Sequence, residues 1–148
     1  MGRFPRLAVC AAAAILSGCT NDVLDASYAT QAEAVAAGAV QRGWIPAWVP
    51  PEARDLREVH SVDTNESALL FTLPVGLNWS PPTSCRDADA GEVSEPAFSR
   101  DWIPKLGAGY DYYSCPSPTA VTGSVPIIAA VAVQQGGQQV LHWRVFAR

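Results

Sequence analysis

The sequence predicts an α+β fold, in which one N-terminal helix packs on a small, mostly antiparallel sheet of about four strands. An alanine-rich stretch near residue 30 has apolar residues at helical spacing. Further along, two pairs of apolar, partly β-branched stretches are separated by polar or glycine-containing turns. In the chain of 148 residues, we expect a leader over 1–18, a tether over 19–27 and a single domain over 28–148.

The first residues have the layout of a secretory signal. Arg3 and Arg6 give a basic start, and a mostly apolar stretch follows up to Gly18. This stretch is shorter than the roughly 20 residues that a membrane-spanning helix needs. Its end, residues 16–19 with the sequence Leu-Ser-Gly-Cys, resembles the bacterial lipobox. The alternative is an ordinary secretory signal with a chance cysteine.

The lipobox resemblance implies a lipid anchor on Cys19. It implies diacylglyceryl transfer to the Cys19 thiol, cleavage after Gly18, and acylation of the new amino terminus, as by palmitate. Each buried methylene contributes roughly 0.8 kcal/mol, so several acyl chains hold much more firmly than one. In Gram-negative lipoproteins, the residue after the cysteine influences the membrane to which the protein is sorted. Here this residue is Thr20 rather than an aspartate. The resemblance therefore implies the periplasmic face of the outer membrane, with the membrane as a partner through the lipid.

The charge balance excludes nucleic acid as a partner. The whole chain has 10 Lys and Arg against 14 Asp and Glu, and Arg3 and Arg6 are removed with the leader. The mature chain therefore carries 8 basic and 14 acidic side chains, a net charge of −6. Such a chain is repelled by phosphate backbones.

Two cysteines remain for the folded domain, because Cys10 lies in the leader and Cys19 is acylated. An even pair in an oxidising compartment predicts a disulfide between Cys85 and Cys115. The alternative is a metal site that combines both cysteines with the two histidines, His60 and His142. No pair among these four residues has close metal-ligand spacing, so we expect neither a metal nor another cofactor.

The predicted helix begins at Thr30, because Thr30 and Glu33 form a Thr-x-x-Glu capping box. Apolar residues then repeat at helical spacing up to Val40, and Gly43 is the expected stop. The next segment, 44–51, has three prolines, which exclude a helix interior and a central strand. This segment carries Trp44 and Trp48.

Two hairpins are predicted. Residues 56–63 and 67–73 read as strands around the polar turn Asp63-Thr64-Asn65-Glu66. Residues 125–133 and 139–146 read as strands around Gly136-Gly137. Between the hairpins, 74–118 is rich in Pro, Gly, Ser and Asp and is predicted to be a loop that the disulfide ties down.

The stretch from the helix to the first hairpin resembles the uncharacterised YbbD head domain of bacterial lipoproteins. The residues that carry the resemblance are Arg42–Pro46, Trp48, Pro50, Ala53–Leu56 and Asp63–Glu66. The resemblance covers roughly residues 28–75 and implies a small α+β domain of the cell envelope. It supplies no catalytic residues.

The sequence offers weak candidates for catalysis. His60 with Asp63 and either Ser61 or Ser67 could form a nucleophilic triad, but the chain has no Gly-x-Ser-x-Gly elbow. The acidic stretch Asp87, Asp89, Glu92 and Glu95 could hold calcium or serve glycosidase chemistry; it does not match the twelve-residue calcium loop and reads as a solvated loop. We expect no catalytic residues and no enzyme.

The tryptophans are the best candidates for binding. The chain has five, and tryptophan is enriched at interfaces. Trp44 and Trp48 lie in a stiff segment that would present them with little entropic loss; alternatively, they cover the edge of the core. We therefore expect a membrane-anchored envelope lipoprotein with a non-enzymatic binding or structural role toward an envelope protein or glycan. The alternatives are a cell-wall-directed enzyme and an inhibitor of an envelope enzyme.

Overall fold

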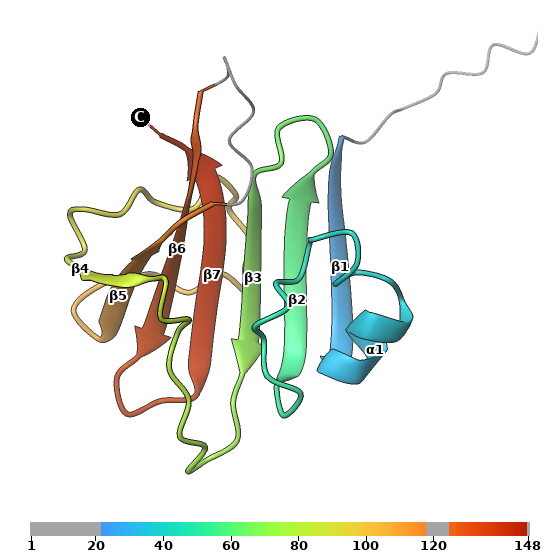
Figure 1. Ribbon diagram of the computed structural model, residues 1–148, viewed down its shortest axis with the longest axis horizontal. Coiled ribbons are helices and arrows are strands. Elements are labelled where there is room, and N and C mark those ends of the chain that lie inside the picture. Colours follow the sequence, from blue (N-terminus) through green and yellow to red (C-terminus); the bar gives the residue numbers. More distant parts are fainter. Residues whose placement is uncertain (1–21, 118–124, 148) are drawn as a thin grey trace, which may run out of the picture.

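The fold is a single antiparallel sheet of seven strands in the order β1-β2-β3-β7-β6-β5-β4 (Figure 1). The computed structural model describes residues 22–117 and 125–147. One helix lies in these residues, α1 (Gln31–Ala36), beside β1 at an edge of the sheet (Figure 1). The strands are β1 (Val23–Thr30), β2 (Arg54–Ser61), β3 (Ser67–Thr72), β4 (Arg86–Ala88), β5 (Tyr110–Cys115), β6 (Ile127–Gln134) and β7 (Gln139–Phe146).

The predicted α+β class is wrong, and the main reason is the length of the helix. The predicted N-cap is present, since the Glu33 amide donates to Thr30 Oγ1 at 3.1 Å. However, α1 ends after six residues because Gly38 adopts the left-handed conformation at φ +75°. The Ala39 amide donates to the Ala34 carbonyl, which closes the helix with a Schellman motif. Gly43, the predicted stop, ends only the turn that follows.

Three strands lie where the sequence predicts none. β1 begins at Val23, inside the predicted tether, and pairs with β2 along its length. Its side chains are half-buried at most because it is an edge strand, so it lacks a strong apolar pattern. β4 and β5 lie in the predicted loop 74–118. β4 has only three residues, and β5 consists mainly of tyrosine and polar residues.

Both predicted hairpins are confirmed. β2 and β3 pair around the turn 62–66, where Asn65 has φ +59° and the Ser61 amide donates to the Glu66 carbonyl. β6 and β7 pair around Gly136, which has φ +62°. The two hairpins meet because β3 pairs with β7 in the middle of the sheet. Residues far apart in sequence are therefore neighbours across this pair.

Both faces of the sheet are covered. We call face A the side that carries Leu56, Leu69, Phe71, Val131 and Val140, against which residues 31–53 pack through Ala34, Ala39, Ile45, Val49 and Ala53. Face B carries Val59, Leu70, Ala132, Leu141 and Trp143, against which Val93, Phe98, Trp102, Ile103 and Leu106 pack. The long segment between β4 and β5 is tied to face B by polar contacts as well. Trp143 Nε1 donates to the Ser94 carbonyl at 2.7 Å, and Arg100 donates to both carboxylate oxygens of Asp25 at 2.8 and 2.9 Å.

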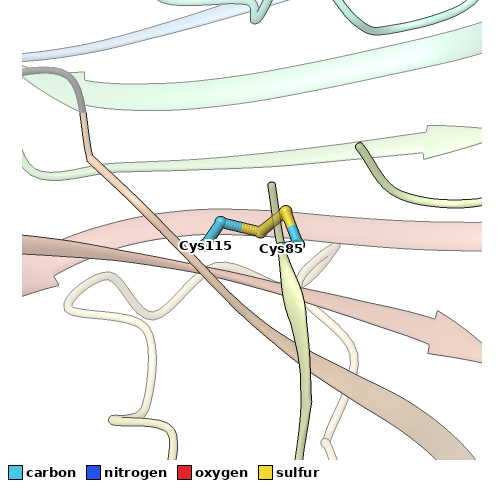
Figure 2. Close-up of a disulfide and its surroundings, with 2 residues drawn as sticks. All are labelled: Cys85 and Cys115. Carbon is cyan, nitrogen blue, oxygen red and sulfur yellow. A yellow bond between two sulfur atoms is a disulfide. The ribbon is translucent and has the colours of Figure 1, made fainter. Parts of the chain in front are cut away.

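The predicted disulfide is present. It joins Cys85, directly before β4, to Cys115, the last residue of β5 (Figure 2). In the antiparallel register Arg86 faces Ser114, so Cys85 and Cys115 are the next pair along these two strands. The bond therefore fixes the short edge strand β4 to the sheet.

We expect removal of this disulfide to destabilise the fold. The bond closes a loop with a sequence separation of 30 residues. In the chain-entropy description, such a loop contributes about 3–4 kcal/mol. The double variant Cys85→Ser/Cys115→Ser should lose about that much free energy of unfolding in a urea titration. A reductant should lower the free energy of unfolding of the wild type and leave that of the double variant unchanged. Equal free energies of unfolding of the two proteins in oxidising buffer would contradict the expectation.

Candidate functional site

A group of polar side chains is buried on face A, where strand alternation would otherwise place core residues. It consists of the buried residues Glu58 and His60 on β2, Ser67 on β3 and His142 on β7, together with Arg144 on β7, which is half-buried. Register brings them together: Ser67 faces His60 on one side and Arg144 on the other. Glu58 and His142 both face Leu69, from opposite sides. Buried polar groups need partners, so their contacts decide what they can do.

Glu58 and His60 satisfy each other. His60 Nδ1 and Glu58 Oε2 are 2.8 Å apart, and both side chains are almost fully buried. The Trp44 ring stacks on the His60 imidazole with centroids 3.6 Å apart and planes within 10°. Burial raises the pKa of Glu58, and the hydrogen bond to His60 opposes this shift. Trp44 thus covers an ionisable pair that would otherwise meet solvent.

Arg144 is only partly satisfied. Its Nε donates to Ser67 Oγ at 2.8 Å, and its guanidinium carbon lies 5.9 Å from the centroid of the Trp44 ring. Its Nη2 is buried and has no hydrogen-bond partner among the described residues. Burial lowers the pKa of Arg144, while the negative charge of Glu58 acts in the opposite direction. An arginine in this position keeps its positive charge, because its ordinary pKa lies far above neutral pH.

His142 is neutral at physiological pH. Burial lowers its pKa to about 3, and the positive charge of Arg144 adds to the shift. The Trp48 ring meets the imidazole nearly at right angles, with centroids 5.3 Å apart. Its Nδ1 is buried without a partner in the described part of the chain. A neutral imidazole carries one N–H, which either ring nitrogen can hold.

His142 and Arg144 both line a pocket of about 380 Å³ on face A. The other walls come from three places: the segment after α1, the disulfide with its neighbours, and β6. They are Val40, Gly43, Ile45, Pro46, Ala47, Trp48, Pro82, Ser84, Cys85, Cys115, Pro116 and Ala129. The pocket therefore combines mostly apolar walls with one cation and one neutral histidine. Its size lies within the range of small-molecule sites.

Trp44 and Trp48, the predicted binding residues, are both half-buried on face A. Trp44 covers His60 and Arg144 and does not line the pocket. Trp48 packs on Phe71 and Trp79, with ring centroids 6.3 and 6.0 Å away, and also forms part of the pocket wall. Both tryptophans therefore serve as packing, and Trp48 is also available to a ligand.

The imagined triad does not assemble. His60 bonds to Glu58, whereas Asp63 is exposed in the β2–β3 turn. Ser67 accepts a hydrogen bond from Arg144 and is 2% exposed. Ser61 Oγ accepts from the Thr64 amide within the turn.

The structure also locates the cysteines of the hypothetical metal site and the acidic stretch. Cys85 and Cys115 are bonded to each other, and within 22–117 and 125–147 no group of three or more His, Cys, Asp or Glu side chains is placed to hold a metal. In the acidic stretch, Glu92 pairs with Arg86 at 3.3 Å, and both side chains are largely exposed.

The leader and Cys19 lie outside the described residues. No helix in the part of the chain that the structure describes is long and apolar enough to cross a membrane.

Comparison with known families confirms the resemblance for the part of the chain that forms β1, β2 and β3. Residues 22–72 match the family model of the YbbD head domain. The match runs from the start of β1 to the end of β3, about a third of the chain. It indicates a bacterial protein associated with the cell envelope. Neither the curated proteins nor the solved structures contain a match.

The match includes Glu58 and His60 but ends before β7, which carries His142 and Arg144. Part of the pocket wall, including Trp48, therefore comes from the matched region. The two polar groups of the pocket come from outside the matched region.

Because His142 is buried as a neutral group, we expect it to make the fold sensitive to acid. The unfolded chain takes up a proton near pH 6.5, and the folded chain does so only near pH 3. Stability from this group is therefore complete above pH 6.5 and falls as the pH falls toward 3. Between pH 7.5 and pH 5 the loss should be about 2 kcal/mol.

The variant His142→Leu isolates this effect. Glu58 has a raised pKa, so its own contribution has the opposite sign: it is complete below pH 4.5 and is lost as the pH rises. Both proteins keep Glu58, and its effect cancels in the comparison. Urea titrations from pH 7.5 to pH 5 should show the wild type losing stability relative to the variant. Parallel stability curves would mean that the pKa of His142 is the same in the folded and the unfolded chain.

Proposed function

We propose that this protein is a lipid-anchored, non-enzymatic binding domain of the bacterial envelope, and that it recognises an envelope component through the pocket on face A. The observation that carries the proposal is the pocket itself. His142 and Arg144 both line it, and each has one buried polar atom, Nδ1 and Nη2 respectively, whose hydrogen-bonding capacity no described residue uses. Groups of this kind orient ligands in otherwise apolar sites.

The proposed anchor lies close to the domain. Three residues, Thr20–Asp22, separate Cys19 from the first residue of β1. They can span at most about 14 Å between Cys19 and Val23. Acyl chains on Cys19 would therefore hold the sheet near the membrane surface, and the outer membrane is the location that the lipobox resemblance favours.

The contacts of the polar group favour binding over catalysis. A general base must have a proton to abstract within hydrogen-bond reach. His60 is engaged by Glu58 on one side of the ring and by the Trp44 ring on its face. His142, with a pKa of about 3, is too weakly basic to act as a base near neutral pH. These features argue against the cell-wall-directed enzyme.

An inhibitory role would be favoured by a loop that projects from the sheet. Most of the large apolar side chains between β3 and β5 pack on the sheet instead. Leu77 and Trp79 contact the core of face A, while Phe98 and Trp102 contact the core of face B. An inhibitor of an envelope enzyme is therefore the weaker candidate.

In-cell photocrosslinking of the lipidated, full-length protein tests the proposal. A photoreactive side chain at Ala47, which is exposed and lines the pocket, should capture one dominant envelope component. The matched control is the same side chain at Arg57, which is exposed on β2 and does not line the pocket. Capture at Ala47 should exceed capture at Arg57 several-fold and should fall when Cys19 is replaced by alanine.

If both positions captured the same scattered set of abundant envelope proteins, this result would overturn the binding role. Capture at Ala47 that the Cys19→Ala change leaves intact would overturn the role of the anchor.

A further inference from the structure

We infer that the pocket on face A binds a carboxylate group, carried by a ligand with a compact apolar portion. This inference rests on the proposed binding function and specifies its ligand. Any such ligand has a planar group with a single negative charge next to an apolar group. A free small organic acid and the carboxyl terminus of a short peptide both fit this description.

The polar groups of the pocket match a carboxylate in number and charge. Arg144 Nη2 is an unused donor of a permanently charged guanidinium, and His142 Nδ1 can hold the single proton of a neutral imidazole. A carboxylate has two oxygens that can each accept one of these bonds. Arginine is suited to it, because planar N–H groups and planar carboxylates pair in one plane.

The charges near the pocket favour a monoanion over a phosphate. Among the described residues that line the pocket, Arg144 is the only cation. The negative charge of Glu58 already acts on it. A phosphate dianion would therefore bring more negative charge than the site can neutralise, and burial of uncompensated charge is strongly unfavourable.

The walls predict the rest of the ligand. The apolar walls of the pocket come from Val40, Ile45, Pro46 and Trp48, and from the Cys85–Cys115 disulfide with Pro116. These groups offer apolar contact and few hydrogen bonds. A short alkyl, a small ring or an alanyl side chain fits a volume of about 380 Å³ beside the carboxylate.

Trp48 would control access to the two polar atoms. Both atoms are shielded from solvent, so a ligand reaches them only after a side chain moves. Trp48 lines the pocket, is half-buried and contacts His142 through its ring. Rotation of this ring would open the way to His142, and its indole N–H signal should report the event.

Binding is measured with the full-length protein in detergent, by calorimetry and by the indole N–H signals in NMR. The probes are benzoate and N-acetyl-alanyl-alanine, each compared with its own carboxamide. We expect at least one carboxylate to bind at least tenfold more tightly than its amide, since the loss of a charge-assisted hydrogen bond weakens binding by about tenfold or more. The Trp48 signal should shift, and the Trp102 signal on face B should not. Binding of benzoate alone would indicate that the ligand is a free organic acid. Binding of the peptide alone would indicate that the ligand is the carboxyl terminus of a peptide.

Variants locate the site. Arg144→Gln should weaken carboxylate binding at least tenfold, while the matched control Arg57→Gln on face B should leave it unchanged. Because Arg144 also contacts Ser67 and Trp44, its loss could disturb the fold. Ser84→Tyr, which adds bulk at an exposed lining residue, should abolish binding without removing a buried contact.

Equal affinity for acid and amide, or no binding of either acid, would overturn the inference. The proposed function is tested separately, because selective capture at Ala47 can succeed when no carboxylate binds. In that case the pocket binds another chemical class.

Discussion

Coverage of both faces of the sheet is the constraint on which the rest of this structure depends. In an antiparallel sheet with one wet face, polar side chains alternate outward into solvent. Here residues 31–53 occupy one face and the segment between β4 and β5 occupies the other. The polar residues that the covering segments enclose must therefore find partners inside the protein. Glu58, His60, Ser67 and Arg144 do so with one another, and the incomplete hydrogen bonding of Arg144 and His142 creates the candidate site.

The sequence predicted those parts of the fold that depend on local signals. The two hairpins follow from alternating apolar residues around turns that contain Asn65 and Gly136, and the N-cap follows from Thr30. The disulfide follows from cysteine count and compartment. The class was wrong because Gly38, which lies inside the predicted helix, ends it, and because β1, β4 and β5 lack a clear alternation of buried apolar and exposed polar residues. These three strands depend on pairing with their neighbours, which a local sequence pattern does not contain.

The candidate site was only half predictable. Trp44 and Trp48 stood out by residue type and by the stiff, proline-containing segment that holds them. His142 and Arg144 alternate with Leu141 and Trp143 along the sequence, but in a sheet with one covered face they would point to solvent. Their burial depends on β3 pairing with β7 and on the chain after α1 crossing face A. The available signal in the sequence was this alternation. It places large apolar side chains on one face of the strand and His142 and Arg144 on the other. Whether the second face is buried or exposed cannot be predicted until it is known what covers that face.

The disulfide has a consequence for when the protein can act. Cys85 and Cys115 form part of the pocket wall, and the bond between them holds Ser84 and Pro82 against the end of β5. In a reducing compartment the two thiols would be separate, and that wall would have no covalent tie. The pocket would then be completed only after the chain reaches an oxidising environment. For the binding role proposed above, oxidation would thus act as a maturation step that completes the pocket outside the reducing cell interior.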